Sequence, residues 1–333
     1  MKQQNSASGI RGWMQQMWQA LRSNKGSDDP LLQATDRVVE IADPVIRQAR
    51  RYRQVLREPI AGSMAYFRSL SDVLPGPVML RPDRYYDDPM VTALFGSPGE
   101  LEEVLRYNPA INRYRKQGYV GEVQALMTME QNERTIFGQK QEGELLLRDV
   151  RQQAVSFSDH RIVAIGPDLE TTKAGIVDRG LEVLATVAME RITTLRAHKA
   201  ELQGKKEYLQ GMVKILGGKS HRQGMFAGPS VKNREELRKV EQLLAEVAQE
   251  LEELYNRIIP PEHSLGHLES VMLEPEKMLT ARTQTLRLDW KGVRVDDLPG
   301  SEGNEITLAE FAIEDVRRSA VLVTFSVTAT VDA

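Results

Sequence analysis

Residues 237–258 read LRKVEQLLAEVAQELEELYNRI, a sequence typical of a long helix with one apolar side. Apolar residues recur in alternating steps of three and four, and this spacing keeps them along a single stripe of a helix. The stripe consists of Leu237, Val240, Leu244, Val247, Leu251, Leu254 and Ile258. Because such a stripe must be covered to leave water, the sequence predicts that this helix pairs with a partner.

A longer helix is predicted upstream, over residues 168–216, with the same alternation of steps. Its apolar seam positions are Leu181, Leu184, Ala188, Leu195, Leu202, Leu209, Met212 and Leu216. Arg191, His198 and Lys205 interrupt this seam at intervals of seven, so one of its two positions is cationic through the middle of the helix. The second helix has no such interruption, which makes it the better candidate for contact with a partner.

The two helices and the glycine-rich tip between them form one predicted unit, a long antiparallel coiled-coil hairpin over residues 167–259. Antiparallel pairing would bring Arg196 toward Glu252. The surplus apolar surface of the second helix predicts a homo-oligomer, since burial of aliphatic side chains drives association. The residues of this helix that we expect to bind a partner are Leu244, Val247 and Leu251. The alternative is burial within the chain, on the sheet or on the N-terminal helices.

Two motifs stand in the tip of the hairpin. Met225 and Phe226 lie among glycines and are predicted to anchor a protein partner, with folding back onto the helices as the alternative. Residues 218–220, Gly-Lys-Ser, resemble the end of a phosphate-binding loop. However, Val213 stands where the first glycine of that motif would be, and a helix precedes the motif instead of a strand. No cofactor is therefore predicted.

A short amphipathic helix is predicted within residues 1–29. Its apolar face contains Ile10 and the expected partner-binding residues Trp13, Met14, Met17, Trp18 and Leu21. A polar stretch with glycine and proline follows at residues 23–30, so we expect the helix to be tethered. Three docking sites are open to it: its own protein, a protein partner, or a membrane surface contacted peripherally through residues 10–22.

The rest of the chain predicts helices followed by strands. Residues 30–118 are expected to be helical, with Asp43 capping a helix that begins at Pro44. Short β-branched or apolar runs in residues 119–166 and 270–333 predict an antiparallel β domain. The expected fold is therefore α+β: N-terminal helices and an antiparallel β domain that the coiled-coil hairpin interrupts.

Two details of the strand regions give more specific expectations. Leu286, Leu288 and Trp290 alternate with polar residues and are predicted to face the same side of a strand. Residues 144–155 match residues 310–321 without a gap, with six identical positions: Glu, Asp, Val, Arg, Ala and Val. This similarity predicts the same strand-turn-strand arrangement on both sides of the hairpin, with coincidence between short strands as the alternative.

Composition limits the classes of function. The 333 residues are enough for two domains, and the formal charge of −3 makes nucleic acid an unlikely partner. The absence of cysteine excludes disulfides and thiolate metal sites, which fits a reducing, cytoplasmic compartment. No apolar segment reaches the length of a membrane-spanning helix, about 20 residues. We therefore expect a cytoplasmic protein, with peripheral contact to a membrane as the alternative.

Few residues suggest catalysis. His263 and His267 are four residues apart, but Gly266 lies between them and no His-Glu-x-x-His motif is present, so no metal is predicted. The sequence also lacks a nucleophile motif and a dinucleotide-binding glycine pattern. The leading hypothesis is a non-enzymatic intracellular scaffold or adaptor that acts through coiled-coil and amphipathic-helix contacts. The alternative is an enzyme whose site is assembled from dispersed His, Asp and Arg residues.

Overall fold

The computed structural model describes residues 29–142, 145–224, 231–258, 260–295, 303–313 and 315–327. Helices and a mainly antiparallel sheet make up this part of the chain, which confirms the α+β class. The chain divides into two compact units. The first is drawn from residues 1–61 and 184–273, and the second from residues 62–183 and 274–333. No helix within the described ranges is long and apolar enough to cross a membrane.

Helices precede, separate and connect the strands. Those before the long strands are α2 (Pro30–Ala42), the 3-10 helix η2 (Pro44–Gln48), α3 (Tyr52–Asp72), the 3-10 helix η3 (Pro82–Asp87), α4 (Pro89–Leu94), α5 (Pro98–Tyr107) and α6 (Pro109–Lys116). Those after β3 are α7 (Leu169–Gly224), α8 (Val231–Ile258), α9 (Pro261–Leu273) and α10 (Pro275–Met278). The two helices predicted over residues 168–216 and 237–258 thus correspond to α7 and α8.

Five of the early helices begin with the same local device. A proline occupies the first turn, where its missing N–H is not needed, and the preceding Asp, Ser or Asn accepts a hydrogen bond from a backbone N–H of that turn. The capping residues are Asp29, Asp43, Asp88, Ser97 and Asn108. The short helices of this region therefore have starting points fixed by sequence.

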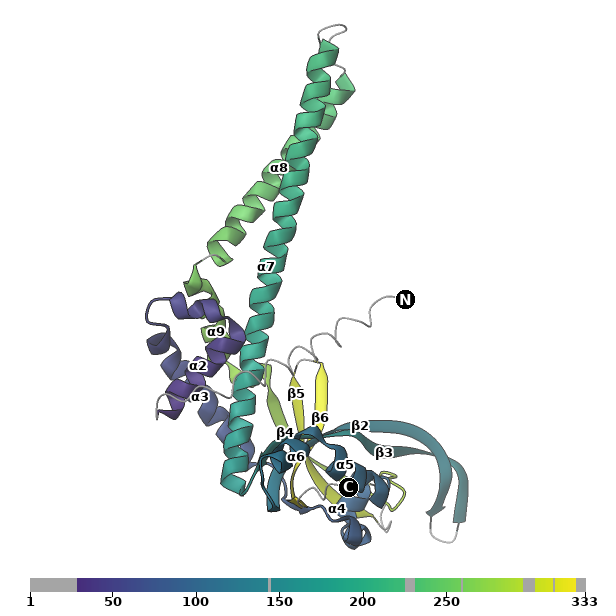
Figure 1. Cartoon of the computed structure of the whole chain (residues 1–333). Helices are drawn as coiled ribbons and strands as arrows, with labels where there is room; N and C mark the ends of the chain where they lie inside the picture. Colours follow the sequence, from purple (N-terminus) through teal and green to yellow (C-terminus); the bar gives the residue numbers. More distant parts are fainter. Residues whose placement is uncertain are drawn as a thin grey trace. The chain divides into compact units, whose positions relative to one another are not determined.

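Six strands form one sheet (Figure 1). They are β1 (Val78–Met79), β2 (Gly121–Glu142), β3 (Leu145–Gly166), β4 (Thr280–Leu288), β5 (Asn304–Ile313) and β6 (Val316–Val327). The order is β3-β2-β6-β5-β4 with antiparallel neighbours, and β1 adds a short parallel pair to β6. Because β2 pairs with β6 only as far as Met129, β2 and β3 continue beyond it as a two-stranded ribbon.

The two outer strands of the sheet are bridged by the turn after β4. Residues 292–295 hydrogen-bond on one side to β3, where Gly292 accepts from Val155 N (2.8 Å) and Arg294 N donates to Gln153 O (2.8 Å). On the other side Val295 N donates to the Arg287 carbonyl of β4 (2.9 Å). A continuous path of backbone hydrogen bonds therefore runs from β3 through the sheet to β4 and back to β3.

Both faces of the sheet are buried near its centre. Alternate residues of β2 and β6, such as Val123 and Val321, belong to the larger core cluster, which also contains side chains of η3 and α4–α6. The intervening residues, such as Leu126 and Leu322, pack on the other face with Ile176 from the first turns of α7. This alternation follows from the two-residue period of strands. It explains why β6 reads as a nearly continuous apolar run.

In the first unit, α7 and α8 share an apolar cluster. Leu202 and Leu209 of α7 are buried with Val247, Leu251 and Leu254 of α8. Half-buried Leu195, Val240 and Leu244 pack against them. The residues that are buried are thus those that the alternating spacing selects.

The prediction of an ion pair between Arg196 of α7 and Glu252 of α8 is wrong. Antiparallel pairing predicts Arg196 near Glu252, but its guanidinium instead bonds the carboxylate of Asp43, and it lies 3.4 Å from the Ser264 hydroxyl. Asp43 is buried and also caps η2 through Val45 N (3.2 Å). A buried carboxylate needs a counter-charge, and Arg196 provides it.

The prediction that residues 144–155 and 310–321 form the same strand-turn-strand arrangement is also wrong. Residues 145–155 lie within the single strand β3, although Asp149 has a positive φ of 57°. The matching residues 310–321 end β5 and begin β6, so a hairpin turn separates them. Short segments adopt the pairing that their neighbours provide, and strand propensity is too weak to override that context.

Candidate functional site

The second unit contains a cavity of about 700 Å³. Its floor consists of side chains from three strands: Val155 and Phe157 of β3, Leu288 of β4 and Ile306 of β5. All four are buried members of the larger core cluster. The wall opposite them is made by the segment 85–100, which runs from η3 through α4 into α5. The cavity is therefore an inlet between the sheet and this helical segment.

Trp290 stands at the rim of the cavity on a tightly bonded turn. One carboxylate oxygen of Asp289 accepts hydrogen bonds from Lys291 N and Val293 N, both at 2.8 Å. Gly292 has a φ of 74°, and a Cβ there would lie 2.7 Å from the Val155 carbonyl oxygen, so only glycine fits. The turn holds its backbone firmly, yet the Trp290 side chain is 86% exposed.

The prediction that Trp290 faces the same side as Leu286 and Leu288 is therefore wrong. Leu286 and Leu288 are buried, as their alternation indicates. Strand β4 ends at Leu288, and the Asp289 turn reverses the chain before the next inward position is reached. A two-residue period holds only while the backbone stays extended.

Among the residues that the structure describes, three charged side chains line the cavity: Glu100, Asp289 and Lys291. Glu100 accepts a hydrogen bond from Gly96 N (2.8 Å) and so completes the cap of α5 with Ser97. Asp289 is engaged by its own turn. The Lys291 ammonium lies 4.7 Å from the centre of the Trp290 ring, a cation–π distance. The two carboxylates are thus used by backbone donors, while the cation stands at the exposed rim.

A buried histidine supports the wall from behind. The His160 ring stacks on Phe95, with 4.5 Å between ring centres, and its Nε2 lies 2.8 Å from the Leu94 carbonyl oxygen. Its Nδ1 is 3.7 Å from the Glu100 carboxylate. Burial lowers the pKa of His160, against the weaker opposing effects of the Leu94 carbonyl and Glu100. His160 therefore fixes the segment 94–96 as a neutral ring at neutral pH.

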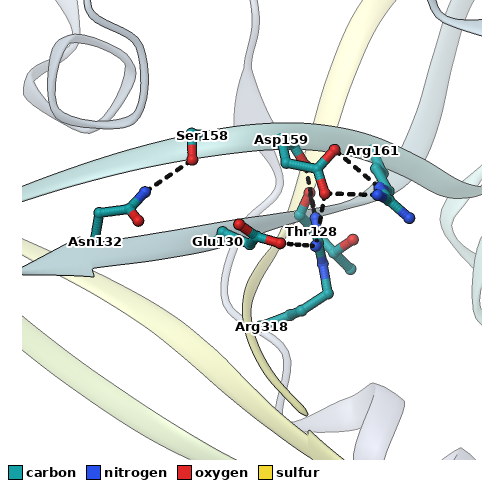
Figure 2. A network of polar contacts seen from close by, with 7 residues as sticks. All are labelled: Thr128, Glu130, Asn132, Ser158, Asp159, Arg161 and Arg318. Carbon is teal, nitrogen blue, oxygen red and sulfur yellow. Dashed lines mark hydrogen bonds and ion pairs between the residues drawn. The ribbon is translucent and has the colours of Figure 1, made fainter. Parts of the chain in front are cut away.

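His160 follows a β-bulge at Asp159. Figure 2 shows Arg318 bound to Asp159 at this bulge. Between the pairs Thr128–Arg161 and Glu130–Ser158, β2 has one residue where β3 has two, and Asp159 takes a φ of 51°. Arg318 reaches from β6 and donates to the Asp159 carbonyl (2.6 Å), the Asp159 carboxylate (2.9 Å) and the Thr128 carbonyl (3.4 Å). It therefore supplies side-chain donors to two backbone carbonyls at the bulge.

The arrangement is suited to binding more than to proton transfer. Glu100 and Asp289 accept hydrogen bonds from backbone N–H groups, and His160 lies behind Phe95 rather than at the cavity surface. An apolar floor with a few polar groups at its edge is the usual composition of a ligand site. The chemistry available at the rim is stacking on exposed rings and attraction to the Lys291 ammonium.

The predicted partner-binding residues of α8 lie in the seam with α7. Val247 and Leu251 are buried against α7, and Leu244 is half-buried beside them. A partner reaches these side chains only if α8 separates from α7. The other predicted residues, Trp13, Met14, Met17, Trp18, Leu21, Met225 and Phe226, lie outside the described residues.

A different surface of the helix pair carries exposed apolar side chains. His198 contacts Glu201 of its own helix (3.9 Å) and Glu250 of α8 (3.2 Å), so both glutamates lie on one flank. One and two heptads along α7 from Glu201 stand Tyr208 and Ile215, and one heptad before Glu250 stands Leu243. These three are 67%, 56% and 45% exposed. We call the five residues Glu201, Tyr208, Ile215, Leu243 and Glu250 the Tyr208 flank.

The two histidines of α9, His263 and His267, lie near the cationic side chain of Arg191. Burial lowers the pKa of His267, and the nearby His263 and Arg191 lower it further. A cationic neighbour disfavours a bound cation. Among the residues that the structure describes, no three His, Asp or Glu side chains come together in a way that could hold a metal ion.

Sequence reasoning missed the residues that form and support the cavity, because no local signal marks them. Tyr86, Trp290 and Arg318 come from three distant segments, and only Arg318 carries a hint, as a charge inside an apolar strand. A comparison with protein-family models, with curated proteins and with solved structures finds no significant match to this chain. Function therefore has to be argued from the geometry alone.

Proposed function

We propose that this protein is a non-enzymatic scaffold or adaptor whose α7–α8 pair acts as an antiparallel coiled-coil hairpin and joins two copies of the chain. The observation that carries this proposal is the Tyr208 flank. The seam of the hairpin is already filled by its own leucines and valines, yet three large apolar side chains remain exposed outside it. Exposed apolar clusters on helices are typical of protein-binding surfaces.

The charges of the two helices favour a second copy as the partner. Residues 195–209 of α7 contain four basic and two acidic side chains, a net charge of +2. The facing residues 240–254 of α8 contain five acidic and no basic side chains, a net charge of −5. If two hairpins meet flank to flank about a twofold axis parallel to the helices, α7 of one copy faces α8 of the other. The net positive α7 of each copy then faces the net negative α8 of the other, while the two charged residues of the Tyr208 flank itself, Glu201 and Glu250, are both acidic.

The expected association is moderate. Burying an exposed Leu, Ile or Tyr side chain contributes roughly 1.5 to 3 kcal/mol, and a twofold interface would bury three from each copy. The loss of translational and rotational freedom opposes association by about 4 to 15 kcal/mol. The surplus is small, so we expect a dimer that dissociates on dilution.

Light scattering over a range of micromolar concentrations tests this proposal. The wild-type chain should show a concentration-dependent dimer, and the triple variant Tyr208→Ser, Ile215→Ser, Leu243→Ser should remain monomeric. The matched control is Gln203→Ser with Gln210→Ser, which changes two exposed side chains of α7 away from the Tyr208 flank. A wild-type monomer at every concentration, or a dimer in the triple variant, would contradict the proposal.

The helix predicted within residues 1–29, most of which lie outside the described residues, supplies a second contact in this proposal. Its apolar residues would bind a protein partner or lie on a membrane surface inside the cell. Deletion of the residues before Pro30 should release the protein from that target in co-purification and membrane-recovery assays. Unchanged recovery would count against this part.

The enzyme alternative rests on the cavity, where Glu100, Asp289 and Lys291 meet. It is the weaker proposal, because one oxygen of each carboxylate is held by backbone N–H groups at the α5 cap or in the Asp289 turn, which gives Glu100 and Asp289 structural roles. The cavity is better explained as a binding site.

A further inference from the structure

We propose that the cavity beside Trp290 binds a small amphiphilic carboxylate, a molecule with an apolar body and one anionic group. This inference is separate from dimerisation through the Tyr208 flank, since it concerns side chains of the second unit only. It rests on three observations: the cavity itself, the exposed rings at its rim, and the balance of charge around it.

The cavity has the size and lining of a ligand site. Its volume of about 700 Å³ falls within the range of roughly 300 to 1,000 Å³ found for small-molecule pockets. The floor side chains Val155, Phe157 and Ile306 are apolar. These floor side chains are only 1–6% exposed, so the apolar body of a ligand would displace water chiefly from the exposed rings of Tyr86 and Trp290 at the rim. The body of the ligand is therefore apolar.

The rim presents two aromatic side chains from separate segments. Tyr86 of η3 is 80% exposed and Trp290 is 86% exposed, although each belongs to a segment anchored in the core. The neighbouring Tyr85 is buried and donates its hydroxyl to the Phe95 carbonyl. Rings that are exposed on a fixed backbone lose little conformational entropy when a ligand covers them. Tyr86 and Trp290 are thus prepared contacts for the ligand.

Lys291 is the positively charged side chain among the described residues that line the cavity. Of the three charged lining residues, Glu100 and Asp289 already accept hydrogen bonds from backbone N–H groups. Lys291 projects over the face of Trp290, where its ammonium is close to any molecule that stacks on that ring. A carboxylate on the ligand would exchange this cation–π contact for a charge-assisted hydrogen bond, which is stronger.

Trp290 itself reports binding. The protein has three tryptophans, so the variant Trp13→Phe with Trp18→Phe leaves Trp290 as the single one. This full-length variant is titrated with octanoate and, separately, with 1-octanol, which has the same chain length and no charge. We expect octanoate to give a saturable shift of Trp290 emission to shorter wavelength, and octanol to bind about tenfold more weakly.

Substitutions at the rim and in the cavity, with one matched control, locate the effect. Lys291→Ala should weaken octanoate binding about tenfold and leave octanol binding unchanged, because only the ammonium distinguishes the two ligands. Lys116→Ala, which removes the same charge from the end of α6 outside the cavity, is the matched control and should bind like its parent. Thr92→Phe narrows the cavity and should reduce the binding of both ligands, and Ala93→Leu serves the same purpose if Thr92→Phe folds poorly.

Three results would overturn the proposal. They are the absence of a saturable emission change with millimolar octanoate, equal binding of octanoate and octanol, and unchanged octanoate binding by both Lys291→Ala and a folded cavity-filling variant. Each is measured in a protein whose dimerisation is determined separately by light scattering. Failure of the ligand site and failure of the scaffold proposal are therefore distinguishable.

Discussion

The sheet of the second unit and the α7–α8 pair of the first hold themselves together in different ways. Strand β6 pairs with β1, β2 and β5, and both of its faces are buried. Helix α8 buries one stripe against α7 and leaves the rest of its surface exposed. Residues of β6 therefore depend on the distant strands β1 and β2 as well as on the neighbouring β5, whereas each seam residue of α8 depends on one neighbouring helix. Matched substitutions in the sheet and in the helix pair test this difference.

The largest effect is expected at Arg318. The change Arg318→Ala should lower the free energy of unfolding of the second unit by about 3 kcal/mol, because it removes the donor to the carbonyls of Asp159 and Thr128 and leaves the Asp159 carboxylate with Arg161 alone. The adjacent Arg317→Ala should change it by less than about 0.5 kcal/mol, since Arg317 is exposed and its ion pair with Glu310 is 3.8 Å long. Urea denaturation gives the free energies, and hydrogen exchange assigns the loss to β2, β3 and β6. Equal effects at the two arginines would show that Arg318 is not a structural link.

In the α7–α8 pair, the substitution expected to cost the most stability is at Leu251. The change Leu251→Ala should cost the first unit about 2 to 3 kcal/mol, since it removes a buried side chain from the seam. Leu243→Ala, on the Tyr208 flank, should cost the monomer about 0.5 kcal/mol or less because Leu243 is exposed. Hydrogen exchange of α8 measures both. A loss of protection spreading into the strands after Leu251→Ala would contradict the independence of the two regions.

The same glycine-to-alanine change should have opposite signs in the two regions. A Cβ at Gly180 would lie 2.5 Å from the ring of Phe67, which is buried, so Gly180→Ala should destabilise the second unit by about 2 kcal/mol. A Cβ at Gly204 meets nothing within 4 Å, and Gly204→Ala should stabilise the first unit by about 0.5 to 1 kcal/mol through helix propensity. Thermal unfolding followed by circular dichroism measures both. Stability changes of the same sign for the two variants would contradict this prediction.

These contrasts explain what could be predicted from the sequence. The seam of α7 and α8 follows a local spacing, and that spacing alone is enough to place Val247 and Leu251 on the apolar stripe. The α+β class follows from the change of period along the chain. Arg196 shows the limit: its partner Asp43 lies 153 residues away, and the spacing of residues within α7 and α8 could not reveal it.

The cavity could not be predicted because its parts are dispersed. Residues of η3, β3, the Asp289 turn and β5 meet there, and each reads as an ordinary strand or turn residue on its own. The prediction for Trp290 fails because it extends the alternation one step past the end of β4. The bulge at Asp159 leaves no mark in the sequence, since it depends on the register of β2 against β3 and on Arg318 from β6. Pairing between distant strands is decided by tertiary contacts.

The smallest effect expected is a pH dependence confined to the sheet region. Burial lowers the pKa of His160 below its ordinary value of about 6.5, with Arg318 acting in the same direction and with the Leu94 carbonyl, Glu100 and Asp159 opposing it. The unfolded chain then binds a proton on this histidine at a higher pH than the folded chain does. The stability that His160 contributes is therefore fully present above about pH 6.5 and declines as the pH falls below that value.

Urea denaturation between neutral and mildly acidic pH should show this decline in the wild type. His160→Gln keeps a donor for the Leu94 carbonyl but cannot titrate, so its free energy of unfolding should fall less over the same range. Parallel pH profiles for the two proteins would mean that His160 is not the titrating group, and that the loss of stability comes from other groups of the chain.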